Sequence, residues 1–321
     1  MFDLNRDAKK SVVQINYLNN IKMIRVAVLL ATHNGSKWIE AQIDSILNQI
    51  GVEVQIFVSD DRSSDNTLAI LDDFARDERV SRLERVDAGY GSPAANFFRL
   101  LLEAPIEVDF EYVFLSDQDD YWLPNKIISA IQEMQLNKAD CYASDLICTY
   151  PDGARRFLKK SYPQTKNDYL FQGASAGCTY GLSARAAVTF RDIIGRLGDA
   201  VRKDISHDWA IYAVTRSHGF QWTLDARAYI DYRQHGENAY GALGLDSYRK
   251  RWLLLKNGWY RKNVLVLASV CLLSKEQQKI IDAVKRWYFR DRFFLLSKVW
   301  SFRRRPIEKV CVGILIVLGL F

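Results

Sequence analysis

Residues 111–126 constrain the fold more than any other stretch of the chain. They open with a run of strand-forming residues, Tyr112 to Leu115, whose unbroken apolar character is typical of a strand buried on both faces of a sheet. Asp117, Asp119 and Asp120 follow at once. Open α/β sheets bind their ligands beyond the carboxyl ends of the strands. The stretch therefore predicts an acidic ligand site at the edge of a buried sheet.

Three neighbouring carboxylates repel one another, so the cluster needs an explanation. A divalent metal ion with oxygen ligands, carrying a diphosphate, would neutralise the charge. The alternative is a solvated turn with an aspartate cap, which is the more frequent origin of an isolated Asp-x-Asp pattern. The buried strand before the cluster and the pattern of the remaining chain favour the metal site.

The first half of the chain alternates apolar strands with amphipathic helices. With 49% hydrophobic and 26% charged residues among 321, the chain is typical of a globular protein with one large domain or two. The alternation predicts an α/β fold with a mostly parallel, doubly wound sheet. We expect strands at 24–31, 52–59, 80–86 and 112–115, and helices at 38–47, 67–76, 94–103 and 125–136.

Polar residues follow these strands where a ligand would bind. Thr32, Asn34 and the glycine after them end the first strand, and this composition suits either close approach to a ligand or an ordinary turn. Asp61 follows the second strand, where a base or a ribose hydroxyl is a suitable partner. Asn96 lies near the start of the helix at 94–103, and helix N-termini favour phosphates.

Beyond residue 137 the alternation changes. We expect a strand at 141–150, an irregular basic loop at 151–169, a helix at 184–197 and an extended stretch at 222–229. Residues 173–181 are rich in glycine and other small residues, which suits either a sugar pocket or a sharp bend. A further helix opens at Ser206, with His207 and Asp208 in its first turn.

Five motifs in order resemble the inverting glycosyltransferases of family 2, particularly the bacterial rhamnosyltransferase-like branch. They are Thr32-x-Asn34, Ser59-Asp-Asp-x-Ser63-x-Asp65-x-Thr67, Asp117-x-Asp119-Asp120, His207-Asp208 and Arg233-Gln-His235. The resemblance covers about residues 24–244. It implies the GT-A fold, followed here by a C-terminal amphipathic helical region.

The resemblance also implies a role for each motif. Thr32, Asn34 and Asp61 would hold the nucleoside, and Asp117 would contact the ribose or the diphosphate. Asp119 would bind Mg²⁺ or Mn²⁺. His235 would be a further metal ligand or a diphosphate contact, with a purely structural histidine as the equal alternative. Asp208 would be the general base, with His207 as the second candidate. His33 stands where the family commonly has an aromatic residue, and it has no clear role.

The implied partners follow from the branch. The donor is a nucleotide-sugar, with dTDP-rhamnose suggested, and the acceptor is a glycan or a lipid-linked glycan in surface polysaccharide synthesis. A dinucleotide-dependent oxidoreductase is disfavoured because residues 31–35 lack the glycine-rich fingerprint, and no P-loop motif occurs. A non-catalytic nucleotide-sugar-binding module remains the alternative, although such a module would not need Asp208.

The sequence divides into three parts. We expect residues 1–23 to be a loosely ordered leader. The resemblance implies a glycosyltransferase domain at 24–245, with a nucleotide-binding part at 24–136 and an acceptor and catalytic part at 137–245. Residues 246–321 carry 17 Lys and Arg against 5 Asp and Glu, whereas the first 245 residues carry 27 against 33. This basic tail predicts amphipathic helices that pack on the domain or lie on a membrane surface.

Nucleic acid is not expected as a partner, because no nucleic-acid-binding motif accompanies the basic charge. The five cysteines are odd in number and form no C-x-x-C motif, which is typical of reduced thiols in a cytosolic protein. The thiols therefore predict a cytoplasmic protein. Together with the basic tail and the resemblance, they lead us to expect an enzyme peripheral on the inner face of the bacterial cytoplasmic membrane.

Overall fold

The computed structural model describes residues 23–84, 89–235 and 252–321. The expected leader at 1–23, except for Met23, lies outside the described residues, as do the first six residues of the tail at 246–321. The sheet orders its strands β3-β2-β1-β4-β8-β6-β9-β5, with β7 paired to β6.

The first four strands form the parallel half of the sheet. These are β1 (Ile24–Thr32), β2 (Val52–Asp60), β3 (Val80–Arg82) and β4 (Tyr112–Asp117), each parallel to its neighbour. The strands at 24–31, 52–59 and 112–115 are confirmed within two residues. β3 is shorter than the expected strand at 80–86 and ends at Arg82, while residues 85 and 86 of that expectation lie outside the described residues.

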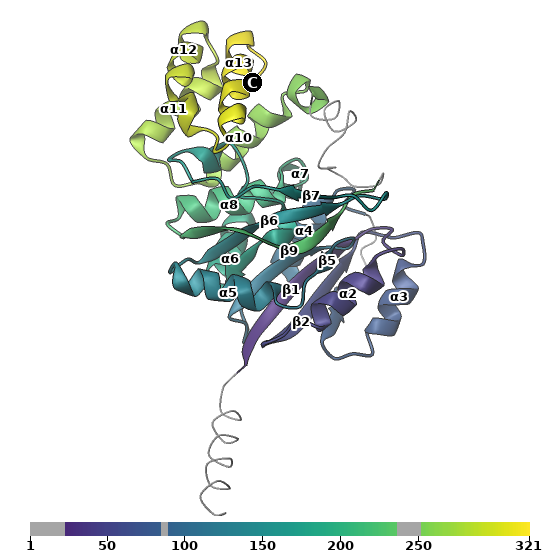
Figure 1. Ribbon diagram of the computed structural model, residues 1–321. Helices are drawn as coiled ribbons and strands as arrows, with labels where there is room; N and C mark the ends of the chain where they lie inside the picture. The colour runs from purple at the N-terminus through teal and green to yellow at the C-terminus, as the bar shows by residue number, and fades with distance from the viewer. Residues whose placement is uncertain (1–22, 85–88, 236–251) are drawn as a thin grey trace, which may run out of the picture.

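Strand β1 explains why helices cover both faces of this half. Its side chains alternate between two cores, because successive residues of a strand point to opposite faces. Ala27 and Leu29 join the core that includes helix α4 (Pro93–Glu103), whereas Val26 and Val28 join the core under helix α2 (Ile39–Leu47). Figure 1 shows α2 beside β1 and β2, with α3 (Thr67–Phe74) next to it. The doubly wound arrangement is therefore confirmed.

The second half of the sheet is mixed. β8 (Gly181–Ser183) pairs antiparallel with β4 and with β6 (Cys141–Thr149), and β6 is parallel to β9 (Trp222–Arg233). The short strand β5 (Tyr121–Trp122) pairs antiparallel with β9. The segment at 151–169 was expected to be an irregular loop, but it contains strand β7 (Arg155–Leu158). This strand forms because its backbone pairs with β6. The helices of this half are α5 (Lys126–Leu136), α6 (Ala184–Ile194), α7 (Asp199–Arg202) and α8 (His207–Ser217).

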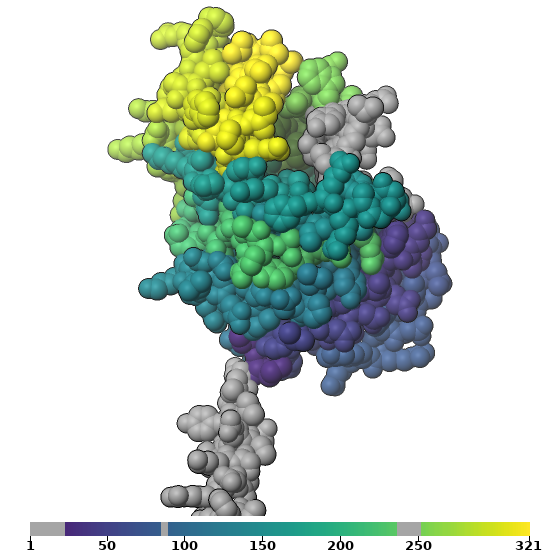
Figure 2. All heavy atoms as spheres, viewed as in Figure 1, coloured from purple at the N-terminus to yellow at the C-terminus, as the bar shows by residue number. Residues whose placement is uncertain are grey.

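The C-terminal segment forms a layer of helices on one end of the sheet domain. It contains α10 (Trp259–Val270), α11 (Lys275–Arg286), α12 (Phe289–Lys298) and α13 (Pro306–Leu318). Figures 1 and 2 show these green-to-yellow helices stacked over the teal middle of the chain. Among the residues that the structure describes, no helix is both long enough and apolar enough to cross a bilayer.

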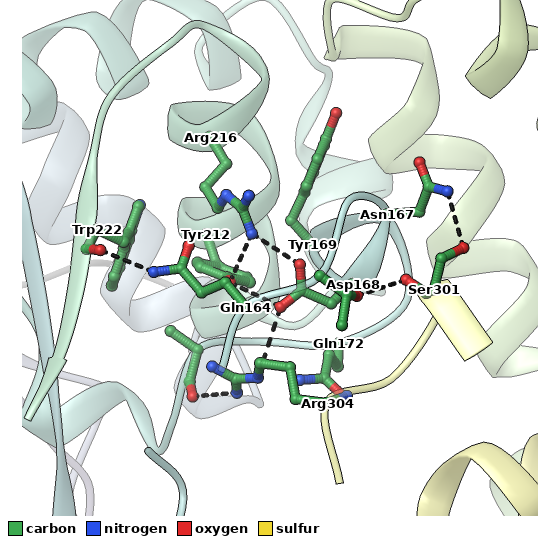
Figure 3. A network of polar contacts seen from close by, with 12 residues as sticks. Gln164, Asn167, Asp168, Tyr169, Gln172, Tyr212, Arg216, Trp222, Ser301 and Arg304 are labelled. Carbon is green, nitrogen blue, oxygen red and sulfur yellow. Dashed lines mark hydrogen bonds and ion pairs between the residues drawn. The ribbon is translucent and has the colours of Figure 1, made fainter. Parts of the chain in front are cut away.

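A buried contact joins this helical layer to the sheet domain. Phe302, in the link before α13, stacks on Phe171 with ring centroids 4.1 Å apart, and both side chains are fully buried. Beside them, Arg304 approaches Asp168, which has no exposed surface and also pairs with Arg216 at 2.7 Å (Figure 3). Burial raises the pKa of Asp168, and the two arginines oppose that shift. Part of the expected tail thus packs as ordinary domain structure.

Candidate active site

The parallel register brings the candidate residues to one edge of the sheet. Thr32 pairs with Asp60, and Ala31 pairs with Asp117 on the other side of β1. Because all three strands run the same way, their polar ends converge, as the sequence pattern predicted. Asp61, one residue past β2, lies at the same edge and donates its backbone N–H to the Thr32 carbonyl at 2.8 Å.

Gln118 fixes the end of β1, a role that sequence reasoning missed. Its Oε1 accepts hydrogen bonds from the Thr32 hydroxyl at 2.6 Å and from the His33 N–H at 2.8 Å. Its Nε2 donates to the His33 carbonyl at 3.0 Å. A Cβ at Gly35 would lie 2.3 Å from Gln118 Oε1, so the glycine permits this close approach. Gln118 stands at the unspecified position of the Asp117-x-Asp119 motif, so its residue type did not indicate this role in the sequence.

Asn34 joins the loops that follow β1 and β2. It adopts a positive φ of 51°, donates its backbone N–H to Ser63 Oγ at 2.8 Å, and accepts from the Ser64 N–H at 2.8 Å. His33, which had no clear role, places its Nδ1 2.7 Å from the Asp61 carbonyl. The two residues therefore hold the candidate nucleoside loop in shape.

Two expected donor-binding residues are already engaged within the protein. The Asp61 carboxylate accepts hydrogen bonds from the N–H groups of Tyr90 and Gly91, the latter at 2.9 Å. Asn96 is buried and bonds to both strand ends: its Nδ2 donates to the carbonyls of Ser59 at 2.9 Å and Thr32 at 3.2 Å. Asn96 thus has the contacts of a support beneath the site.

The acidic cluster is unusually dense. Burial, reinforced by the charges of Asp119 and Asp208, raises the pKa of Asp117 to about 8. Burial, reinforced by the charges of Asp119 and Asp117, also raises the pKa of Asp120 well above its ordinary value, while the Cys178 thiol and Lys126 oppose the shift. One ligand atom each of Asp117, Asp120 and Cys178 lies within 4.8 Å of the others. The carboxylate oxygens suit a hard divalent cation, whereas the cysteine sulfur does not.

Asp120 belongs to the acidic cluster that the sequence predicted, although it had no assigned role, whereas Cys178 and Lys126 were not expected at the site. Lys126 is 1% exposed, and its Nζ lies 3.5 Å from the centre of the Trp122 ring. Burial lowers its pKa to about 7. A buried lysine behind the acids was not recognisable in the sequence, because Lys126 occupies an ordinary first-turn helix position.

His235 lies against Asp119, as expected for a shared site. Its Nε2 is 2.8 Å from Asp119 Oδ2, although 116 residues separate the two in sequence. Trp38 orients the imidazole by stacking, with ring centroids 5.5 Å apart. Arg233 lies over the Trp38 ring, with its Cζ 5.2 Å from the ring centroid. Strand β9 thereby brings its carboxyl end to the acidic cluster.

Asp208 lies in the first turn of α8, where Ser206 is the N-cap residue. Its Oδ1 accepts from the Trp209 N–H at 2.7 Å and from the Ser206 hydroxyl. His207 stacks on Phe97 with ring centroids 4.3 Å apart, and burial lowers its pKa, against the opposing charge of Asp208. This packing favours Asp208 over His207 as the base.

The small residues at 173–181 pack against the start of α8. A Cβ at Gly177 would lie 2.5 Å from His207 Nε2 and 3.5 Å from the Asp208 Cβ, and one at Gly173 would lie 3.5 Å from the Trp209 nitrogen. The Tyr180 hydroxyl accepts from the Ala174 N–H at 2.7 Å and fixes the bend. These contacts make the segment a close-packed support for the candidate base.

Comparison with known proteins agrees with this geometry. The family model for glycosyl transferase family 2 matches residues 27–194, more than half of the chain. The dTDP-rhamnosyl transferase RfbG of Shigella flexneri is 34% identical over 295 residues, which cover 91% of this chain and all of that protein.

Two further similarities are more limited. The Escherichia coli enzyme WfaP, a UDP-Glc:alpha-D-GlcNAc-diphosphoundecaprenol beta-1,3-glucosyltransferase, is 28% identical over 113 residues, covering 35% of this chain and 42% of that protein. The crystal structure of Staphylococcus aureus TarS 1–349 with UDP matches with a TM-score of 0.56 and 15% identity, over 81% of this chain and 70% of that one. The similarity to TarS supports the fold alone. The family match and the identity to RfbG show that the chain belongs to glycosyl transferase family 2.

Proposed function

We propose that this glycosyltransferase moves rhamnose from dTDP-rhamnose to a hydroxyl of a glycan or lipid-linked acceptor, with inversion at the anomeric carbon. The supporting observation is the convergence of Asp61, Asp117, Asp119 and Asp208 around the carboxyl ends of β1, β2 and β4. The rhamnosyl donor is supported by the end-to-end similarity to RfbG. The shorter similarity to WfaP supports another hexose as the alternative donor sugar.

The proposed donor site uses the strand ends directly. Thr32, Asn34 and Asp61 hold the nucleoside, and Asp117 contacts the ribose or the diphosphate. Asn96 keeps the ends of β1 and β2 together through its two backbone carbonyl contacts, so its contribution to donor binding is indirect.

Family 2 enzymes typically depend on a divalent metal ion, and the acidic cluster fits one. Burial and the charges of neighbouring carboxylates raise the pKa of both Asp117 and Asp120, and a cation would relieve the repulsion between these charges. We assign Asp119 and His235 as the residues that hold Mg²⁺ or Mn²⁺. When bound, the ion supplies Lewis-acid stabilisation of the leaving diphosphate.

The proposed base is Asp208. An acceptor hydroxyl must lose a proton as it attacks the anomeric carbon, and a carboxylate in hydrogen-bond reach can take it. Within the described part of the chain, the hydrogen bonds from Ser206 and Trp209 both reach Oδ1 of this carboxylate. They fix its orientation, so that Oδ2 is the atom to which we assign the proton.

We further assign residues 24–245 to the catalytic domain and residues 246–321 to a basic helical region. The proposed location is the cytoplasm, peripheral on the inner face of the cytoplasmic membrane, where a lipid-linked acceptor would be available.

A donor panel with matched variants tests this function. The full chain is incubated with dTDP-rhamnose, UDP-glucose and UDP-N-acetylglucosamine, with Mn²⁺, Mg²⁺ or EDTA, and donor binding and slow hydrolysis are measured. We expect dTDP-rhamnose to be used best and EDTA to abolish turnover. Asp119→Ala should lose metal-dependent donor binding, while the exposed-surface control Asp192→Asn should behave as wild type.

The base assignment needs an acceptor assay. Asp208→Asn should retain donor binding and lose about 10²–10⁴-fold in transfer rate, the usual contribution of a general base. Transfer at the wild-type rate would refute the role of Asp208. Donor binding without hydrolysis or transfer in the wild-type protein would instead favour a non-catalytic binding module.

A further inference from the structure

One surface of the helical layer is apolar and exposed. On α13, Ile307, Val310, Ile314, Val317 and Leu318 are each about half exposed or more, from 49% to 61%. Their spacing of three, four, three and one residues places them on one side of a helix. Val312 and Ile316, on the opposite side, are buried against the domain. We call these five exposed residues the α13 face.

The α13 face has a cationic and aromatic end. Trp300 is 63% exposed, and Lys309 lies over its ring with Nζ 5.4 Å from the centroid. Arg305, the N-cap residue of α13, is also exposed. From Val310 to Phe321 the sequence carries no charged residue. The helix thus presents an apolar side that begins at a Trp and two cations.

We propose that the α13 face is a membrane-binding surface that lies in the plane of an anionic bilayer. Trp prefers the headgroup level of a bilayer, and exposed Lys and Arg are attracted to anionic lipid. A 13-residue helix is too short to span the hydrocarbon core but suits an interfacial position. The proposal deepens the peripheral location given above by naming the surface and the lipid class, and it is independent of the donor sugar.

Charge distinguishes a lipid surface from a second copy of the chain. Residues 246–321 carry 17 Lys and Arg against 5 Asp and Glu. Two such regions brought face to face would repel each other, whereas an anionic lipid surface attracts the same charges. Asp291 and Glu308, the acids of α12 and α13, are both close to arginines, Asp291 to Arg286 at 2.7 Å and Glu308 to Arg303 at 3.9 Å.

Vesicle flotation tests the surface with the full-length protein. The probes are vesicles of phosphatidylcholine alone and of phosphatidylcholine with about one third phosphatidylglycerol, at low and high salt. We expect binding to the anionic vesicles, weakened by salt. The double variant Ile314→Asn/Val317→Asn should lose at least about tenfold in vesicle affinity. The control variant is Leu136→Asn. It changes an apolar residue that is 79% exposed on α5, outside the helical layer, and this variant should bind vesicles as the wild type does.

Further measurements separate the electrostatic from the apolar contribution to binding, and a membrane from a second copy of the chain. Lys309→Gln/Arg305→Gln should weaken binding to anionic vesicles and reduce its salt dependence. Thermal unfolding checks that every variant folds, and donor hydrolysis in solution should be unchanged in all of them. Equal flotation of wild type and Ile314→Asn/Val317→Asn would overturn the proposal, as would failure of the wild type to bind anionic vesicles. A wild-type dimer in sedimentation that the double variant abolishes would assign the face to a second copy and also overturn it.

Discussion

Replacing Arg304 with methionine tests whether the helical layer supports the active site. Arg304 is 7% exposed and donates through Nη2 to the carbonyls of Gly173, at 3.0 Å, and Ala174. Its Nε lies 3.5 Å from Asp168 Oδ2. Methionine keeps most of the apolar stem but removes the charge and these hydrogen bonds. Because residues 173 and 174 begin the segment that packs under Asp208, the change should reach the candidate base.

The expected loss of stability follows from what remains after the substitution. Hydrogen bonds to a charged group contribute about 1.5–3 kcal/mol each, and breaking a buried ion pair costs about 3–5 kcal/mol. Asp168 keeps Arg216 at 2.7 Å and the Tyr212 hydroxyl at 2.9 Å, so it does not become an isolated buried charge. We therefore expect the free energy of unfolding to fall by about 2–4 kcal/mol, below the sum of the separate contributions.

Urea unfolding followed by tryptophan fluorescence measures the stability, and steady-state kinetics measures the site. We expect kcat to fall about tenfold with little change in the donor KM, because a small displacement of the base affects transfer more than binding. Arg303→Met is the matched control, since the neighbouring Arg303 donates to the Tyr260 hydroxyl at 2.9 Å. Equal stability loss in both variants, with kcat unchanged in Arg304→Met, would refute this reasoning.

Two further substitutions examine the packing on either side of this contact. Gly177→Ala places a Cβ 2.5 Å from His207 Nε2, so the segment or the imidazole must move, and kcat should fall several-fold while donor affinity is retained. Wild-type kcat in this variant would show that the start of α8 tolerates displacement. Phe302→Ala removes a fully buried ring stacked on Phe171 and should lower the free energy of unfolding by about 3–5 kcal/mol in urea titration. A loss below about 1 kcal/mol would indicate that the helical layer contributes little to the domain.

The sequence was most informative where local pattern and tertiary position coincide. The strands at 24–31, 52–59 and 112–115 were recognisable because both faces are buried, which requires continuous apolar residues. The acids that follow these strands were recognisable as site residues because the carboxyl ends of parallel strands meet at one edge of the sheet. The shortened β3 and the unexpected β7 depend on pairing partners, which local sequence does not specify.

Contacts between distant segments could not be predicted. Trp38 stacks on His235 across nearly the whole domain, and Arg304 meets Asp168 over 136 residues of sequence. His235 was recognisable from its motif, but Trp38, Asp168 and Arg304 have unremarkable local settings, and their roles exist only once the segments pack. The tail was therefore left with two interpretations, of which the buried side of α10–α13 supports packing and the exposed α13 face supports a membrane surface.

The hydrogen bonds of Asp61 have a consequence for nucleotide affinity. The carboxylate accepts from the backbone of Tyr90 and Gly91, with one amide on each oxygen. In the role proposed for Asp61, each carboxylate oxygen keeps a lone pair for the nucleoside, and the two amides fix the directions of these lone pairs. The apparent dissociation constant then contains little cost for ordering this side chain on binding. Substitutions at residues 89–91 would consequently change that constant through Asp61, which makes this short segment a target for altering nucleotide affinity.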